Sequence, residues 1–253
     1  MIEILILSLI QGVTEFLPIS SSSHLFIISE FMEFENQNLS IDVSLHIGSF
    51  LAVITYFRKD FLNFAKNTKI FMKILISSIP VILVGFFLVK TNLINELRNI
   101  KLIAWMTIIF GILLYISDKF EINKNIEKNF SYKSAIVIGI FQILSLIPGV
   151  SRSGITITAA RILHFKRFDA AKISFLLSIP TLGAVSFYGI ANIISSTNLY
   201  FSILNILSIT LSFFFSLITI RYFLKYLKKF NLNVFIYYRI FLGSILLLFA
   251  YSQ

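Results

Sequence analysis

Two short polar clusters interrupt apolar stretches of the sequence, and their residue types could carry acid–base and nucleophilic chemistry. In the first cluster, Gln11 and Glu15 are one helical turn apart and project from the same face of a helix. His24 follows Ser21 by three residues and shares a face with it if a second helix starts near position 20. A hydroxyl beside an imidazole, with a carboxylate in reach, is the arrangement that activates a serine or positions a general base. The serine run could equally be a capping and turn sequence, and His24 an interior histidine with satisfied hydrogen bonds.

The second cluster, Pro148 to Thr156, has the composition of an anion site. It reads Pro-Gly-Val-Ser-Arg-Ser-Gly-Ile-Thr and offers flexible backbone, hydroxyl groups and one guanidinium ahead of an apolar helix. Helix N-termini favour negative charge, and arginine binds phosphate oxygens in a bidentate manner. We therefore expect Arg152 to meet a phosphate group or Glu15. An arginine that pairs with a helix C-terminus for packing is the structural alternative.

The composition of the whole chain is that of a membrane protein. Of its 253 residues, 57% are hydrophobic and only 13% are charged, whereas soluble domains contain about 25% charged residues. The net charge is +10, but the basic residues lie in short groups between apolar runs, which argues against a nucleic-acid partner. The absence of cysteine excludes disulfide scaffolds, cysteine-ligated zinc and thiol catalysis. Residues 1–16 lack a basic region and a small-residue cleavage site, so we expect them to belong to the mature protein.

Six apolar stretches are long enough, at about 17–25 residues each, to cross a bilayer as helices. They cover roughly residues 41–57, 74–90, 102–117, 173–194, 200–222 and 234–251. Residues 4–34 and 134–165 are also apolar, but a proline followed by small polar residues divides each into halves too short to span. We interpret both as re-entrant helix–loop–helix hairpins, which enter the bilayer and return on the same side. The sequence therefore predicts an all-α integral membrane protein with six transmembrane helices and two re-entrant hairpins; two ordinary kinked spans are the alternative.

The distribution of basic residues orients these elements. Lysines and arginines of short loops favour the cytoplasm, and four loops hold most of them: 58–73, 119–133, 164–172 and 221–229. If each hairpin returns to its own side, alternation of the spans places all four loops inside and leaves Lys90, Arg98 and Lys101 outside. Both termini then face outward, the first hairpin enters from outside, and the second enters from inside.

The opposite entry sides of the hairpins indicate an internal repeat. The halves 1–118 and 131–253 each comprise one hairpin and three spans, and an offset of 130 pairs Pro18 with Pro148 and Ser21 with Ser151. We therefore interpret residues 1–253 as a single membrane domain of two inverted-topology repeats. Such folds build their site near the membrane midplane, where the broken helices meet. The same signature is typical of a secondary transporter or lipid flippase with a midplane anion site, which is the functional alternative to an enzyme.

The two clusters resemble the motifs of one known family. Gln11-x-x-x-Glu15 followed by Phe-Leu-Pro-Ile-Ser-Ser, with the later Pro-Gly-Val-Ser-Arg-Ser-Gly-Ile-Thr, is similar to the (E/Q)xxxE and PGxSRSxxT motifs of the bacterial undecaprenyl-diphosphatase family, the BacA-type lipid pyrophosphatases. The resemblance covers essentially the whole chain. It implies hydrolysis of undecaprenyl diphosphate to undecaprenyl phosphate and inorganic phosphate, which recycles the carrier lipid for peptidoglycan synthesis and confers bacitracin resistance. It also implies the bacterial cytoplasmic (inner) membrane, a site that opens to the outer face, and a divalent cation, Mg²⁺ or Ca²⁺.

On the basis of this resemblance, we expect the diphosphate to lie between the two hairpin tips. Ser21 would attack the terminal phosphorus with His24 as general base, or His24 would be the nucleophile and Ser21 a phosphate ligand. Glu15 would orient His24 or hold the cation together with Gln11, which stands where many family members have glutamate. Further groups are expected to bind the phosphates: Arg152, Ser20, Gly149, Ser151, Ser153, Gly154 and Thr156.

The prenyl tail of the substrate would lie along apolar walls of the protein, in contact with membrane lipids. The sequence is also compatible with a homo-oligomer. His46, Arg161 and Arg239 also lie within apolar segments, where ionisable groups are costly and therefore functional candidates. We expect His46 to line the cavity, and Arg161 and Arg239 to neutralise carboxylates or helix ends.

Overall fold

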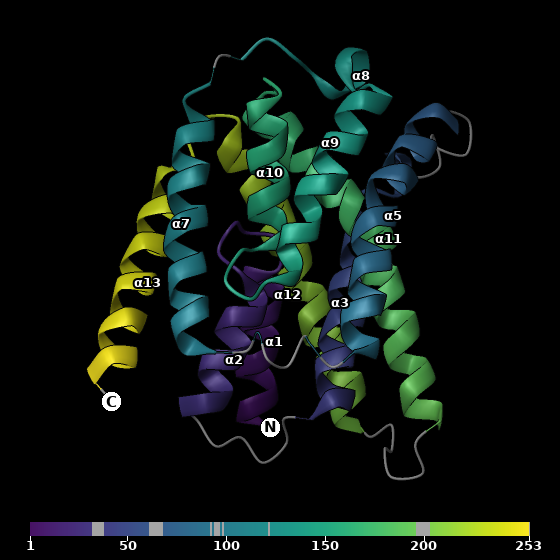
Figure 1. Cartoon of the computed structure of the whole chain (residues 1–253). Coiled ribbons are helices and arrows are strands. Elements are labelled where there is room, and N and C mark those ends of the chain that lie inside the picture. The colour runs from purple at the N-terminus through teal and green to yellow at the C-terminus, as the bar shows by residue number, and fades with distance from the viewer. Residues whose placement is uncertain are drawn as a thin grey trace.

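The computed structural model of the chain describes residues 1–31, 38–60, 68–91, 93, 97, 99–120, 122–195 and 203–252. These residues form a bundle of helices (Figure 1). Six of the helices are long and apolar enough to cross a membrane: α3 (Leu39–Tyr56), α5 (Thr68–Lys90), α7 (Ile100–Asp118), α11 (Arg167–Ser195), α12 (Ile203–Leu227) and α13 (Asn233–Ser252). The six predicted spans are confirmed, with ends that differ from the observed helices by up to six residues; positions 200–202 of the fifth span lie outside the described residues.

Two pairs of shorter helices occupy the segments that the sequence divides with a proline. The first pair is α1 (Ile2–Thr14) and α2 (Ser21–Phe31), and the predicted positions 32–34 of this hairpin lie outside the described residues. The second pair is α9 (Tyr132–Ile143), continued by the 3₁₀ turn η1 (Leu144–Leu146), and α10 (Arg152–Ile162); the one-turn helix α8 (Ile126–Asn129) precedes it. At about 1.5 Å per residue, none of these four helices reaches the roughly 30 Å of a hydrocarbon core. Their lengths suit hairpins that re-enter the membrane, and that insertion stays a prediction.

The two hairpins approach each other from opposite ends of the bundle. Both chain termini and the open end of the first hairpin lie at the lower end in Figure 1, whereas the second hairpin opens at the upper end. Their tips are in contact, because the Ser153 hydroxyl donates to the Leu17 carbonyl at 2.7 Å and Arg152 bonds to Glu15. The predicted convergence of the two tips is therefore confirmed.

Each hairpin packs against a long helix of the other predicted half. Helix α1 contacts α12, and α9 contacts α5. Both contacts depend on a glycine: a Cβ atom at Gly12 would lie 2.5 Å from Cβ of Phe215, and one at Gly139 would lie 2.5 Å from the carbonyl oxygen of Ser77. Small residues let helix backbones approach closely within membranes. This reciprocal packing supports the inverted repeat, which stays a prediction.

The tips share an unusual backbone conformation. Ser20 has φ 76° and Ser151 has φ 71°, and each directly precedes the second helix of its hairpin. Such values cost an L-residue about 1–3 kcal/mol and concentrate at functional sites. The Ser151 hydroxyl caps α10 by accepting from the Gly154 amide at 3.1 Å. By backbone conformation, Ser20 of the first tip corresponds to Ser151 of the second. This correspondence is shifted by one residue from the alignment that pairs Pro18 with Pro148.

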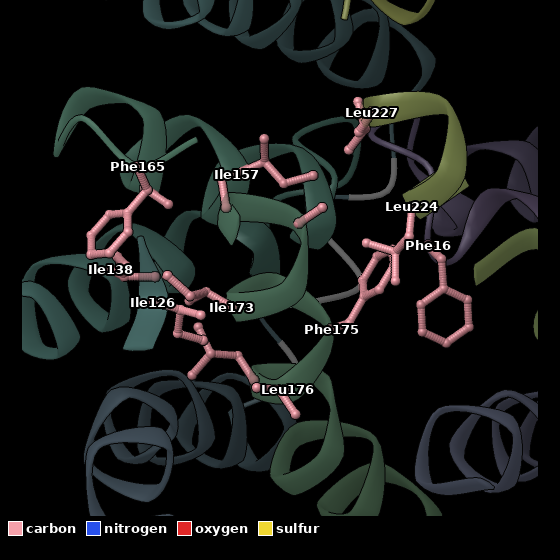
Figure 2. Packing of buried hydrophobic residues seen from close by; sticks show 14 of the residues in the cluster. Phe16, Ile126, Ile138, Ile157, Phe165, Ile173, Phe175, Leu176, Leu224 and Leu227 are labelled. Atoms are coloured by element: carbon pink, nitrogen blue, oxygen red, sulfur yellow. The ribbon is translucent and has the colours of Figure 1, made fainter. Parts of the chain in front are cut away.

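A buried aromatic residue holds the first tip in place. Phe16 is fully buried and meets the ring of Phe175 on α11 edge to face, with centroids 5.2 Å apart. Figure 2 shows the two rings with Leu224 of α12 nearby, and the cluster continues to Ile157 on α10. A buried aromatic pair contributes about 0.5–1.5 kcal/mol beyond the area it removes from solvent. Phe16 thereby fixes the position of its neighbour, Glu15.

The end of the bundle opposite the termini is organised around Asp118. Arg161 is fully buried and donates to the Asp118 carboxylate at 3.2 Å and to the Phe165 carbonyl at 2.7 Å. Arg167 donates to the same carboxylate at 2.7 Å. The expectation that Arg161 neutralises a carboxylate is confirmed. The membrane side of this end stays a prediction, and Lys66 and Arg98, which entered the charge argument, lie outside the described residues.

Candidate active site

Glu15 is the central acceptor at the junction of the two tips. Its Oε1 accepts a hydrogen bond from Arg152 Nη2 at 2.5 Å, across the junction. Its Oε2 accepts from the Ser21 hydroxyl at 2.6 Å and from the Gln11 amide at 3.1 Å. The carboxyl group is 7% exposed, and a buried charge of this kind requires both an opposite charge and hydrogen bonds. The predicted contact of Arg152 with Glu15 is confirmed.

A cavity of about 190 Å³ opens beside this junction. Its walls are Thr14, Glu15, Ser20, Ser21, His46, Ser145, Ser151, Arg152, Leu182 and Val185. Both tips therefore contribute hydroxyl groups and one charge each to a single space. A larger hollow of about 520 Å³ lies near Asp118 and Arg167, but none of the predicted site residues lines it.

Arg152 has an uncommitted donor in this region. Its Nη1 atom is buried and has no hydrogen-bond partner among the described residues, while Nη2 bonds to Glu15. A buried donor without a partner is costly and rare in native proteins. A phosphate oxygen in the cavity would satisfy this donor, because the guanidinium fork matches phosphate geometry.

The structure does not bring His24 to Ser21. His24 Nδ1 lies 2.6 Å from the Ser20 carbonyl oxygen, and Nε2 lies 2.6 Å from the Tyr238 hydroxyl, with the two rings stacked. Because a carbonyl only accepts, Nδ1 donates to it, and Nε2 of the neutral ring accepts from Tyr238. The hydroxyl of Ser21 instead donates to Glu15, since a carboxylate is a stronger acceptor than an imidazole. The side chain that accepts the hydrogen bond from Ser21 is therefore Glu15, and His24 does not line the cavity.

Several predicted phosphate ligands also lie away from the cavity. They are Gly149, Ser153, Gly154 and Thr156, whereas Ser20, Ser151 and Arg152 do line it. The Ser153 hydroxyl donates to the carbonyl of Leu17, and the Thr156 hydroxyl lies 2.7 Å from that of Ser174 on α11. These hydroxyl groups hold the tips and the helix ends, so they would reach a phosphate only after those bonds break.

Three further polar residues line the cavity. The expectation for His46 is confirmed; its Nδ1 donates to the carbonyl one turn earlier at 2.8 Å, which leaves Nε2 of the neutral ring as an acceptor. Sequence reasoning missed Thr14 and Ser145. Each follows a glutamine by three residues, Gln11 in the first half and Gln142 in the second. That repeated spacing was the signal that could have found them.

The donor set at the junction fits a divalent cation held jointly with a substrate. Among the described residues no group of three or more histidine and carboxylate side chains could hold a metal alone. Glu15 is the carboxylate of the cavity, and the amide oxygen of Gln11 is buried without a partner. Mg²⁺ is usually held by one or two carboxylates together with substrate phosphates and water. Glu15, with Gln11 beside it, meets that requirement.

Fold and site together define a multi-pass helical membrane protein with a charged cavity between two hairpin tips. The chain belongs to the family described as bacitracin resistance protein BacA, whose family model matches residues 4–245. It is 50% identical over 252 residues to the undecaprenyl-diphosphatase of Pelagibacter ubique (strain HTCC1062), covering 99% of this chain and 98% of that protein. It is 39% identical over 251 residues to the undecaprenyl-diphosphatase of Saccharophagus degradans, covering 94% of both chains. The undecaprenyl-diphosphatase of Jannaschia sp. (strain CCS1) is 37% identical over 260 residues, covering 98% of this chain and 97% of that protein. The family resemblance that the two motifs indicate is confirmed.

Proposed function

We propose that this chain is an undecaprenyl-diphosphatase, which hydrolyses undecaprenyl diphosphate to undecaprenyl phosphate and inorganic phosphate. Relatives with this name match it over nearly the full chain at up to 50% identity. The observation that carries the proposal is the carboxylate of Glu15, which joins the hydroxyl of Ser21 to the guanidinium of Arg152 at the wall of one cavity. The product is the carrier lipid used again in peptidoglycan synthesis, so its supply confers bacitracin resistance.

The first chemical step transfers the terminal phosphoryl group to Ser21. As Oγ of Ser21 attacks the terminal phosphorus, its proton passes along the existing 2.6 Å hydrogen bond to Glu15. The bond from that phosphorus to the bridging oxygen breaks, and undecaprenyl phosphate leaves with the bonding electrons. Phosphoryl transfer depends mainly on positioning and charge stabilisation. Nη1 of Arg152 supplies that stabilisation, since it is the uncommitted cationic donor beside the cavity.

The second step returns the enzyme to its starting state. Water attacks the phosphoserine, inorganic phosphate forms, and Oγ of Ser21 takes back the proton held by Glu15. The orientation of His24 supports this assignment over a histidine nucleophile, because His24 does not line the cavity and both of its ring nitrogens already have hydrogen-bond partners. A divalent cation, Mg²⁺ or Ca²⁺, is part of the proposal; when bound, it neutralises charge on the phosphates, and Glu15 and Gln11 are the residues that would hold it.

The proposed setting is the bacterial cytoplasmic membrane, with the cavity open to the outer face and the prenyl tail in lipid. The first hairpin, which carries Glu15 and Ser21, opens at the same end of the bundle as the two termini. The positive-inside rule assigns the loop 119–133 to the cytoplasm, and helix α8 of this loop lies at the opposite end of the bundle (Figure 1).

Release of phosphate by the purified protein in detergent tests the proposal. We expect inorganic phosphate from a C55 diphosphate with the wild-type chain, and strong loss of release with Glu15→Ala or after addition of a chelator. A transporter or flippase, which the names of the relatives do not favour, would release none because detergent leaves no membrane to cross. A folded wild-type protein that releases no phosphate would refute the proposed function.

A further inference from the structure

Arg239 occupies an unusual position for a charged residue. It lies on α13, is fully buried, and forms none of the ion pairs found among the described residues. The expectation that it neutralises a carboxylate is therefore wrong, and the expectation of a helix end is wrong as well, because the carbonyl groups it bonds to lie in the hairpin tips and within α7. A buried charge is costly unless hydrogen bonds compensate it, so the partners of this guanidinium indicate its role.

Among the described residues, the partners of the Arg239 guanidinium are all backbone carbonyl oxygens. Nη1 donates to Pro18 at 3.2 Å and to Val150 at 3.0 Å, and Nη2 donates to Gly149 at 2.8 Å. Nε donates to Thr107 on α7 at 3.1 Å. Pro18 belongs to the first hairpin tip, and Gly149 and Val150 belong to the second. A single side chain therefore connects both tips to the α7–α13 helix pair.

The surrounding helices leave room for this side chain. A Cβ atom at Gly111 of α7 would lie 3.2 Å from Cβ of Arg239, and one at Gly154 of α10 would lie 3.0 Å from its Nη1. The neighbouring residue Tyr238 contacts His24 of α2 at 2.6 Å. Two successive residues of α13 thus bond to the first hairpin, and Arg239 alone bonds to both hairpins.

The other bonds between the tips involve residues that the reaction uses or that could bind phosphate. Glu15 and Arg152 bond to each other, and Ser153 bonds to the Leu17 carbonyl. In the proposed reaction Glu15 takes up the proton of Ser21, so its negative charge is lost and its ion pair with Arg152 weakens during phosphoryl transfer. Arg239 is not among the residues that line the cavity, so the binding of a diphosphate there does not require its hydrogen bonds to change.

We propose that Arg239 is a positioning residue that sets the separation of the two hairpin tips, and through it the placement of Ser21 relative to Arg152 during phosphoryl transfer. The catalytic part of this inference rests on the proposed function. The structural part, in which Arg239 bonds to both tips and holds them together (the Arg239 clamp), does not. Lysine cannot replace the arginine, since one ammonium cannot reach carbonyl groups on three elements as a planar fork does.

Arg161 provides a matched control. It is also fully buried and donates to backbone carbonyl groups, but at the Asp118 end of the bundle. We expect Arg239→Lys to lower kcat about 100-fold, the effect of a misplacement near 1 Å, with KM little changed because the prenyl tail still binds. Arg161→Lys should lower the thermal midpoint at least as much and leave kcat of the folded enzyme near the wild-type value.

Hydrogen–deuterium exchange of the detergent-solubilised protein gives a readout that needs no activity. Arg239→Lys should speed exchange at residues 15–23 and 147–154 together, whereas Arg161→Lys should leave both tips protected. Faster exchange in a protein that releases no phosphate would support the clamp and refute the proposed function. Wild-type kcat in Arg239→Lys, equal loss of kcat in Arg161→Lys, or unchanged exchange at the tips would overturn the inference.

Discussion

Replacement of Arg152 by lysine tests how the cavity recognises phosphate. The guanidinium places one nitrogen on Glu15 and leaves a second, buried nitrogen free for a phosphate oxygen. A lysine ammonium at this position can pair with Glu15 or reach the phosphate, but it cannot present two donors side by side. The variant keeps the charge and loses the fork.

The expected loss follows from the number of bonds removed. One hydrogen bond to a charged group is worth about 1.5–3 kcal/mol, and each 1.36 kcal/mol is about tenfold in rate. Arg152→Lys should therefore lower kcat/KM for a C55 diphosphate by roughly 10- to 150-fold, measured as phosphate release in detergent. Arg167→Lys is the control, because Arg167 bonds to Asp118 far from the cavity. Turnover by Arg152→Lys within about twofold of wild type would refute bidentate recognition, because the loss of one hydrogen bond to a charged group should lower the rate by about tenfold or more.

Three further substitutions separate the roles of the remaining residues. With substrate labelled in the terminal phosphate, acid quenching should trap label on the peptide containing Ser21, and Ser21→Ala should abolish it; label on His24 instead would reject the serine nucleophile. Glu15→Gln keeps the shape of the side chain but removes the base, so phosphate release should fall by about 10²–10⁴-fold, and near-normal release would assign the base elsewhere. Tyr238→Phe removes the partner of His24 outside the cavity, so the free energy of unfolding should fall by about 1–3 kcal/mol with kcat nearly unchanged. A large drop in kcat would show that His24 takes part in the chemistry.

The architecture could be predicted from the sequence because two strong signals agree. Apolar runs of spanning length predict the six long helices, and Pro18 and Pro148 divide the two remaining segments into short halves. Neither signal depends on tertiary packing, which is why each predicted span overlaps its helix, with ends that differ by at most six residues. The contact between Arg152 and Glu15 was also predictable, since two opposite charges in apolar segments need each other.

The pairing of groups within the site was less predictable. Spacing along a helix predicts that His24 and Ser21 share a face, but it does not show that Glu15 turns back to bind the serine, or that Tyr238 from the last helix holds the histidine. The partners of Arg239 were unpredictable for the same reason. They are backbone carbonyl groups of two loops and of α7, and because every residue has a carbonyl group, the residue types do not indicate which ones bind the arginine.

The central claim is that one diphosphate head binds between residues of both hairpin tips, and a structure with a non-hydrolysable methylene diphosphonate of a prenyl alcohol tests it most directly. We predict a terminal phosphonate within hydrogen-bond distance of Nη1 of Arg152 and beside Oγ of Ser21, in the cavity that now lies between them. A diphosphonate bound elsewhere, for example in the hollow near Asp118 and Arg167, would contradict the account.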